Sequence, residues 1–206
     1  FWVGAMVLFL VGCVVDRPSH PAAGHTHQSP PLPVPDTYAG EFGAWEDHFY
    51  RWNGERYVAF WMRGVDLGVG MPGTQPGDLA PNYDDYRRWF ADMSARGINT
   101  LRIYTLHFPR FYEAIADHNE ANPASPLYVL HGVWLTANRT HDGNDLHDLT
   151  ENFDGRIEEV VDAVHGSLEV GHRYGQAHGV FTRDISAWVC GYLIGREIYE
   201  EEVIAT

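Results

Sequence analysis

Four short apolar runs alternate with three segments in which apolar residues recur at helical spacing, and this alternation constrains the fold more than any other feature. The runs cover residues 64–67, 98–106, 126–135 and 185–194. Strands that are separated by helices are joined by right-handed crossovers and therefore lie parallel to one another. The sequence thus predicts a domain of the α/β class, either a barrel or a doubly wound sheet.

Local signals place the boundaries of the helices. Asn82 is a predicted N-cap, Gly97 a predicted stop, and Pro109 can open the second helix. The third helix is predicted from its apolar positions, which are Ile157, Val160, Val161, Val164 and Leu168. Residues 171–184 are expected to be irregular. Before the first strand, Asn53 and Gly54 separate two aromatic runs and predict a β-hairpin with a two-residue turn.

The loop after the first strand favours a barrel over a doubly wound sheet. It runs from Gly68 to Pro81 and contains neither a G-x-G-x-x-G fingerprint nor a phosphate loop, which would need lysine. Barrel enzymes carry long loops at the carboxyl ends of their strands, and their sites lie there. We therefore expect the N-terminal half of an eight-stranded (β/α) barrel, preceded by the hairpin.

Charge excludes one large class of partner. The chain has 14 cationic residues, all arginine, and 28 acidic ones, for a formal net charge of −14. Without basic clusters it has no means of neutralising phosphates, so nucleic acid is not an expected partner. The hydrophobic fraction of 45% excludes disorder for most of the chain.

The first fifteen residues carry no charge and are too few to span a bilayer, which takes about 20 residues. Near the end of this segment, Leu10–Cys13 resembles a bacterial lipobox. Residues 1–15 are therefore predicted to be a lipoprotein-type signal segment. A lipid on Cys13 would anchor the protein to a membrane outside the cytoplasm. The alternative is the tail of an ordinary signal peptide or a simple anchor. If Cys13 carries a lipid, Cys190 has no partner and is expected to be buried. No disulfide framework is predicted.

Residues 16–40 form a predicted Pro/His-rich linker, and residues 41–206 the domain. The linker histidines could bind a metal, but a flexible spacer is the simpler interpretation. The loop Thr140–Asp148 could hold a divalent cation, but it lacks calcium-loop spacing, and a polar insertion beside a cleft is the simpler interpretation. No metal or cofactor is predicted.

Chemistry-bearing residues end each strand, and here a resemblance appears. The phrases RGVD (63–66), GINTLRIY (97–104), YVLH (128–131) and GYLIGRE (191–197) resemble strands one to four of the retaining glycoside hydrolases with barrel domains. They are similar to β-1,3-glucanosyltransferases and to β-galactosidase and β-glucuronidase relatives. The resemblance covers roughly residues 52–198 and implies a two-carboxylate mechanism.

The resemblance assigns roles to individual residues. It makes Glu197 the general acid/base and Arg102 the support of the nucleophile, which lies on strand seven and is expected outside this chain. Asp66, Tyr104, His131, Trp134 and Arg196 are the candidate substrate-binding residues. Most of these residues have an alternative: Asp66 could cap or bridge a strand end, Arg102 could be one member of a buried ion pair, His131 could be a core histidine, and the aromatic residues could serve packing.

Arg196 departs from the family, which has asparagine before the acid/base. A guanidinium cannot accept a hydrogen bond, and a neighbouring cation favours the ionised form of Glu197, whereas a general acid must be protonated. Glu200, Glu201 and Glu202 are expected in the solvated first turn of the next helix.

The resemblance thus implies an exported, lipid-anchored glycoside hydrolase or transglycosylase acting on β-linked polysaccharide. One alternative is a non-catalytic carbohydrate-binding barrel. A further, weaker alternative is a metal-dependent hydrolase that uses the loop at residues 140–148. Because a whole barrel takes about 250 residues, we expect the chain to be a fragment.

Overall fold

The structure is a computed structural model that describes residues 40–45, 48–75, 78–135 and 145–206. The signal segment at 1–15, Cys13 and almost all of the linker at 16–40 lie outside the described residues, as does most of the loop at 140–148. In the described part of the chain, no helix combines the length and the apolar character needed to cross a bilayer.

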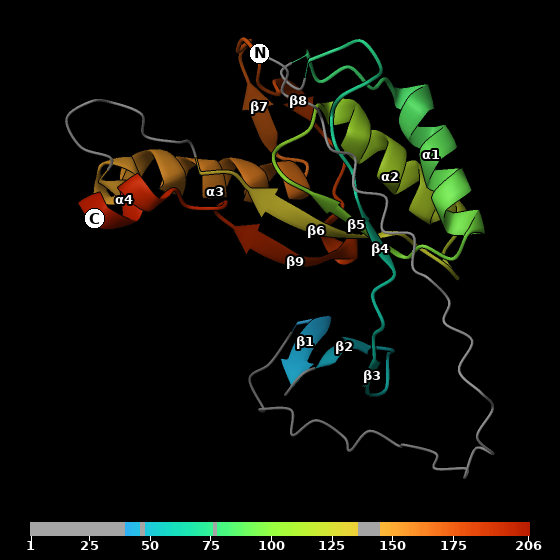
Figure 1. Cartoon of the computed structure of the whole chain (residues 1–206). Coiled ribbons are helices and arrows are strands. Elements are labelled where there is room, and N and C mark those ends of the chain that lie inside the picture. The colour runs from blue at the N-terminus through green and yellow to red at the C-terminus, as the bar shows by residue number, and fades with distance from the viewer. Residues whose placement is uncertain (1–39, 46–47, 76–77, 136–144) are drawn as a thin grey trace, which may run out of the picture. The chain divides into compact units, whose positions relative to one another are not determined.

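The centre of the fold is a sheet of four parallel strands (Figure 1). The strands are β4 (Gly64–Asp66), β5 (Thr100–Ile103), β6 (Tyr128–Val133) and β9 (Val189–Ile194). They lie in the order β4-β5-β6-β9, so spatial order follows chain order without a reversal. The α/β class is therefore confirmed, and the four described strands form an open sheet.

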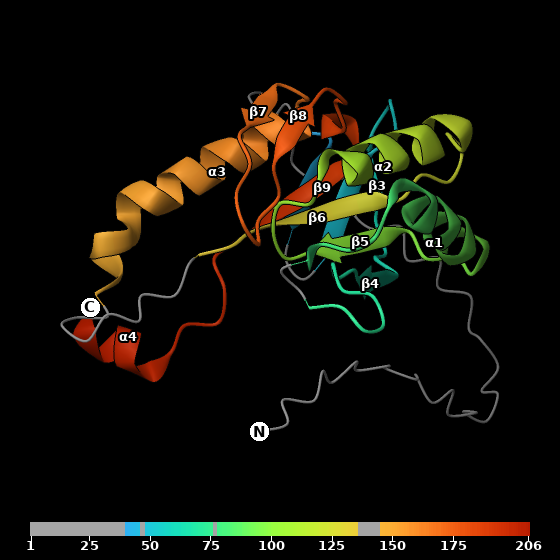
Figure 2. The ribbon, with the colours of Figure 1, turned by 90° about the horizontal axis from the view of Figure 1, so that it is seen from above.

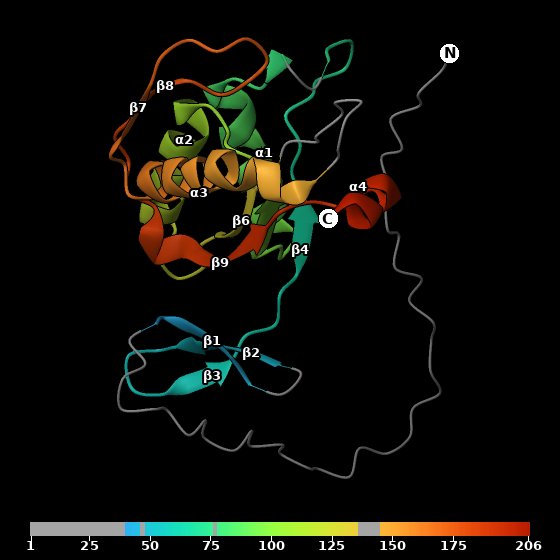
Figure 3. The same ribbon diagram turned by 90° about the vertical axis from the view of Figure 1, so that its left-hand side faces the viewer.

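Three helices connect these strands, namely α1 (Tyr83–Ala95), α2 (Pro109–Ala121) and α3 (Thr150–Val164). All three cover the same face of the sheet (Figure 3). Their apolar residues share one core with Leu101 and Ile103 of β5 and Val129 and Val133 of β6. Side chains alternate along a strand, so the residues between these, such as Arg102, point to the opposite face.

The predicted helix boundaries are largely confirmed. Asn82 and Asp85 form a reciprocal capping box at the start of α1, and Gly97 follows its end with a φ of +77°. Pro109 opens α2 at its first position. In each case the local signal for a helix end agrees with the tertiary structure, so the sequence alone was enough to predict that end.

The predicted hairpin is present, but its loop is longer than expected and a third strand joins it. Strands β1 (Phe42–Trp45), β2 (His48–Trp52) and β3 (Tyr57–Ala59) form an antiparallel sheet. Trp52 pairs with Tyr57, which leaves a four-residue loop between them. The Asn53 side chain accepts hydrogen bonds from the backbone N–H groups of Glu55 and Arg56, and this stabilises the longer loop.

The segment after α3 is more regular than predicted. The helix ends at Val164 because Gly166 adopts a φ of +67°, and Leu168, expected within the helix, begins β7 (Leu168–Val170). Strand β7 pairs in an antiparallel hairpin with β8 (Gly179–Phe181), which lies inside the segment that was expected to be irregular. Two single 3₁₀ turns, at Leu146–Leu149 and Ser186–Trp188, precede α3 and β9.

The last helix, α4 (Glu200–Ala205), lies beside the start of α3 (Figure 2). The Thr206 hydroxyl accepts a hydrogen bond from the backbone N–H of Leu146, which joins the two regions. Glu200 and Glu201 are exposed as expected for a first turn. The expectation for Glu202 is wrong, because this residue is only 1% exposed.

Candidate functional site

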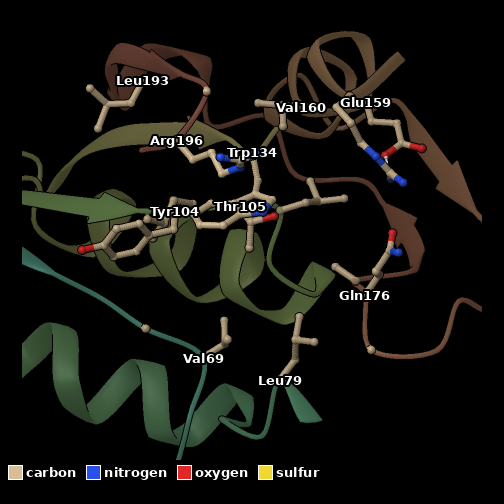
Figure 4. A pocket seen from close by; sticks show the side chains of 18 of the residues that line it. Val69, Leu79, Tyr104, Thr105, Trp134, Glu159, Val160, Gln176, Leu193 and Arg196 are labelled. Atoms are coloured by element: carbon tan, nitrogen blue, oxygen red, sulfur yellow. Dashed lines mark hydrogen bonds and ion pairs between the residues drawn. The ribbon is translucent and has the colours of Figure 1, made fainter. Parts of the chain in front are cut away.

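A cavity of about 790 Å³ opens at the carboxyl ends of the parallel strands (Figure 4). Its wall combines the loop after β4, the ends of β5, β6 and β9, helix α3 and the segment between β7 and β8. Five of the predicted site residues line it: Arg102, Tyr104, Trp134, Arg196 and Glu197. Residues that are far apart in the sequence therefore meet in one space, because parallel strands bring their carboxyl ends to the same edge.

Asp66, Arg102 and Tyr104 form a connected cluster beside the cavity. The Tyr104 hydroxyl donates a hydrogen bond of 2.9 Å to Asp66, and the Arg102 guanidinium lies 3.7 Å from the same carboxylate. The guanidinium also stacks on the Tyr104 ring, 4.4 Å from its centroid. Burial and the hydrogen bond to Asp66 raise the pKa of Tyr104, so its hydroxyl stays protonated and donates.

Arg102 is not fully satisfied within this cluster. Its Nε–H is buried, and no acceptor for it exists in the described part of the chain. An unpaired N–H in a desolvated position is costly, and because this nitrogen is covered by protein an additional anion cannot reach it. The Arg102 side chain as a whole is 43% exposed, so a further acidic partner has access to its exposed part.

Glu197 is exposed and lies in the cavity wall just after β9. It is close enough to Tyr104 for its charge to contribute to the raised pKa of that phenol. Trp134 lies in the same wall after β6, and the exposed fractions of Trp134 and Tyr104 are 44% and 39%. Partly exposed aromatic rings beside a carboxylate can stack on the apolar faces of a ligand while the carboxylate exchanges protons.

Arg196 lines the cavity, but its donors are already engaged. Its guanidinium forms a two-pronged ion pair with Glu202, in which both side chains are buried, with exposed fractions of 3% and 1%. It also donates to the carbonyl oxygens of Leu135 and Glu197, at 2.8 and 2.6 Å. Arg196 therefore fixes the backbone on which Glu197 is carried, and Glu202 balances the charge next to that carboxylate.

His131 does not line the cavity. Its side chain is fully buried on the helix face of β6, where Nε2 lies 2.7 Å from the Tyr112 hydroxyl. Burial lowers the pKa of His131 to about 4, so the ring is neutral. The structure therefore places His131 in the core, as the alternative interpretation of the sequence allowed.

Sequence reasoning missed the far end of the cavity. Glu159 and Gln176 lie there, opposite Tyr104 (Figure 4), with Arg156 and Arg173 in the same wall. Both arginines pair with Glu159, each at 2.8 Å. A signal was available for two of the four: Arg156 and Glu159 stand three residues apart on the helical face that also carries Val160.

Among the described residues, no group of three or more His, Cys, Asp or Glu side chains is arranged to hold a metal ion. Comparisons with models of known protein families, with curated proteins and with solved structures found no match to this chain. The function of the chain is therefore inferred from its residues and from the geometry of the cavity.

Proposed function

We propose that this chain carries the acid/base half of a retaining glycoside hydrolase or transglycosylase that acts on β-linked polysaccharide. The observation that carries the proposal is the convergence of Arg102, Tyr104, Trp134 and Glu197 on one cavity. The resemblance assigns these residues to a single site on the strength of sequence alone. Their meeting at the carboxyl edge of a parallel sheet agrees with that assignment.

The strand order supports the finer part of the proposal, which is that the sheet is half of a barrel. A doubly wound sheet reverses its strand order and carries helices on both faces. Here β4, β5, β6 and β9 follow chain order, and α1, α2 and α3 share one face. Both features are expected of consecutive βα units in a barrel.

In the proposed mechanism, Glu197 protonates the glycosidic oxygen as the leaving sugar departs. It then removes a proton from the water or hydroxyl group that attacks the glycosyl-enzyme. Arg102 holds a nucleophilic carboxylate on a strand that follows in the complete barrel, and its side chain, 43% exposed, is accessible to such a partner. Asp66 orients Tyr104 through their hydrogen bond, and Trp134 offers a stacking surface for a sugar ring.

The ion pair between Arg196 and Glu202 removes one objection to this mechanism. A free cation beside Glu197 would favour the ionised carboxylate, but the Arg196 charge is compensated by a buried carboxylate. Arg196 is accordingly proposed to position the backbone of Glu197 and not to bind the sugar.

The experiment is an assay of the full-length protein on a panel of soluble β-glycans. Glu197→Gln should abolish turnover while the variant still binds the glycan, because glutamine keeps the shape but cannot transfer the proton. Glu201→Gln, an exposed residue of α4 outside the cavity, is the matched control. Unchanged turnover after Glu197→Gln would contradict the proposal.

A non-catalytic carbohydrate-binding module is the second candidate, and one observation favours it. The other glutamate of the cavity, Glu159, is already paired with Arg156 and Arg173 and is not a free nucleophile. Glycan binding without turnover by the full-length protein would select this candidate.

We also propose that the protein is exported and held at a membrane by a lipid on Cys13. The support is the lipobox-like sequence alone. Metabolic labelling with a fatty acid should mark the wild-type protein and fail to mark Cys13→Ala; equal labelling would contradict the proposal.

A further inference from the structure

The charge balance of the cavity is the reverse of that of the chain. The whole chain has 14 arginines against 28 acidic residues. The cavity wall holds four arginines, at positions 102, 156, 173 and 196, against two acidic residues, Glu159 and Glu197. Arginine side chains are thus concentrated in one cavity of an otherwise acidic protein, and such a concentration of positive charge attracts anionic groups.

Pairing shows where in the cavity positive charge is left over. Asp66 faces Arg102 and Glu202 neutralises Arg196, so these two cations are balanced by carboxylates next to the cavity, and Glu197 leaves a negative charge at that end. At the far end, Arg156 and Arg173 share the single carboxylate of Glu159. This cluster of three residues, here called the two-arginine cluster, therefore carries one positive charge that no further carboxylate of the described residues pairs with.

The environment of the two-arginine cluster makes that charge effective. The three side chains are about three-quarters buried, with exposed fractions of 25 to 27%. Solvent therefore screens the charge less than it would at an open surface. Both Nη atoms of Arg173 already donate, to Glu159 and to the Ala177 carbonyl, and its Nε–H is buried out of reach of a ligand. Among the described residues Arg156 donates to Glu159 through Nη1 alone, so its Nη2 and Nε donors remain for one more acceptor group.

We propose that the two-arginine cluster binds a carboxylate on the polysaccharide, so that the substrate is an acidic β-glycan containing uronic acid. One surplus positive charge matches one singly charged substituent. Guanidinium groups are planar forks that pair best with planar carboxylates. The inference rests on the proposed function, since it assigns a subsite to the same cavity. The subsite lies across the cavity from Tyr104 (Figure 4).

The test measures equilibrium binding by the full-length protein in a Glu197→Gln background, which prevents turnover. The probes are β-1,3- and β-1,4-linked glucose tetrasaccharides, the same tetrasaccharides oxidised at C6 to uronates, and the same ones sulfated at C6. For one linkage the uronate should bind about tenfold more tightly than the neutral sugar, the ratio that one charge-assisted contact supplies. The preference should shrink in about 0.5 M salt.

Variants assign the preference to the cluster. Arg156→Gln and Arg173→Gln should each weaken uronate binding about tenfold while changing neutral binding less than twofold. Arg183→Gln is the control, because Arg183 pairs with Asp117 and Glu120 and does not line the cavity. If Arg173→Gln fails to fold, Arg156→Gln decides alone, since the ion pair of Arg156 lies within its own helix.

The outcomes separate this inference from the proposed function. Equal binding of neutral and oxidised sugars, or a preference for the sulfated sugar, overturns the uronate subsite and leaves the glycan site standing. Binding of none of the tetrasaccharides overturns both. A uronate preference that persists in both arginine variants also overturns the subsite.

Discussion

The guanidinium of Arg196 donates to three protein residues, and Glu202 supplies the charged acceptor among them. Glu202 also accepts the backbone N–H of Tyr199 at the start of α4. One buried carboxylate thus balances a cation and caps a helix. The backbone of Glu197 is therefore held by this ion pair together with the hydrogen bonds from Arg196 to the carbonyl oxygens of Leu135 and Glu197.

Removing the Glu202 charge should therefore destabilise the protein. Glu202→Gln leaves Arg196 buried without a counter-ion and should lower the free energy of unfolding by about 3 kcal/mol. Chemical denaturation measures the change, with Glu201→Gln as an exposed control that should shift it by less than about 0.5 kcal/mol. Replacing both partners, Arg196→Met with Glu202→Leu, should recover most of the loss. Equal effects of the two glutamine variants would contradict the ion-pair account.

Two fully buried histidines, His107 and His131, should make stability depend on pH. Burial, with a smaller contribution from nearby charges, lowers the pKa of His107 to about 3, and burial lowers that of His131 to about 4. In the unfolded chain both titrate near 6.5. Between these values the unfolded state binds more protons, so the stability is full above about pH 6.5 and is lost as the pH falls towards 4.

Each histidine should contribute a slope of about 1.4 kcal/mol per pH unit near pH 5. Denaturant unfolding of the wild type and of His131→Gln at about pH 7.5 and 5 measures how the free energy of unfolding depends on pH. The variant should lack the contribution of one histidine to this dependence. His165→Gln is the control, because the His165 side chain is 53% exposed. A slope that is unchanged in His131→Gln would show that His131 is not held neutral.

At the level of elements, the approach of β6 to β5 depends on Gly132. A Cβ atom at this position would lie 2.3 Å from the carbonyl oxygen of Tyr104 and 2.6 Å from that of Ile103. Both contacts are with backbone, which can relieve them only if a strand moves. Tyr104 is part of the cavity wall, so this glycine links sheet geometry to the site.

Gly132→Ala should lower the free energy of unfolding by about 2 kcal/mol, as overpacking does. Gly155→Ala is the matched control, since a Cβ there meets nothing within 4 Å and the residue lies inside α3. The control should gain up to about 1 kcal/mol, because alanine is the better helix former. Thermal or chemical unfolding compares the two, and a shared sign would contradict the close approach.

How far the sequence predicts an element depends on where its signal lies. The capping box at Asn82, the glycine at 97 and the proline at 109 act locally, and the helices they bound were predicted well. The hairpin of β7 and β8 was missed because each strand has only three residues, too few to show an alternating pattern. Leu168 fits the helical spacing of α3, but Gly166 ends the helix before it.

The site was predictable where strand ends carry unusual residues, and less so elsewhere. Arg102, Tyr104, Trp134 and Glu197 follow from the strand pattern together with the resemblance. The sequence did not predict whether His131 points to the helix face or to the opposite face of the sheet. Its strand is almost continuously apolar, so no alternation of polar and apolar residues distinguishes the two faces. Arg173 joins the cavity only through the tertiary placement of the segment between β7 and β8.

On the scale of the whole molecule, the parallel sheet brings the strand ends together, and the cavity takes its charge from α3 and from the segment after it. The central claim is that Glu197 acts as the proton donor in this cavity. Proton donation matters only when the leaving group is poor, and this gives the claim a kinetic signature that a structural role for Glu197 lacks.

The most direct measurement is therefore kcat/KM of the full-length protein on two aryl β-glycosides of one sugar, one with a poor leaving group and one with dinitrophenolate. Glu197→Gln should reduce kcat/KM on the poor leaving group by about 10²- to 10⁴-fold and on the dinitrophenyl glycoside by less than about tenfold. Glu201→Gln should change neither. An equal loss on both substrates, or no loss on either, would contradict the role of Glu197.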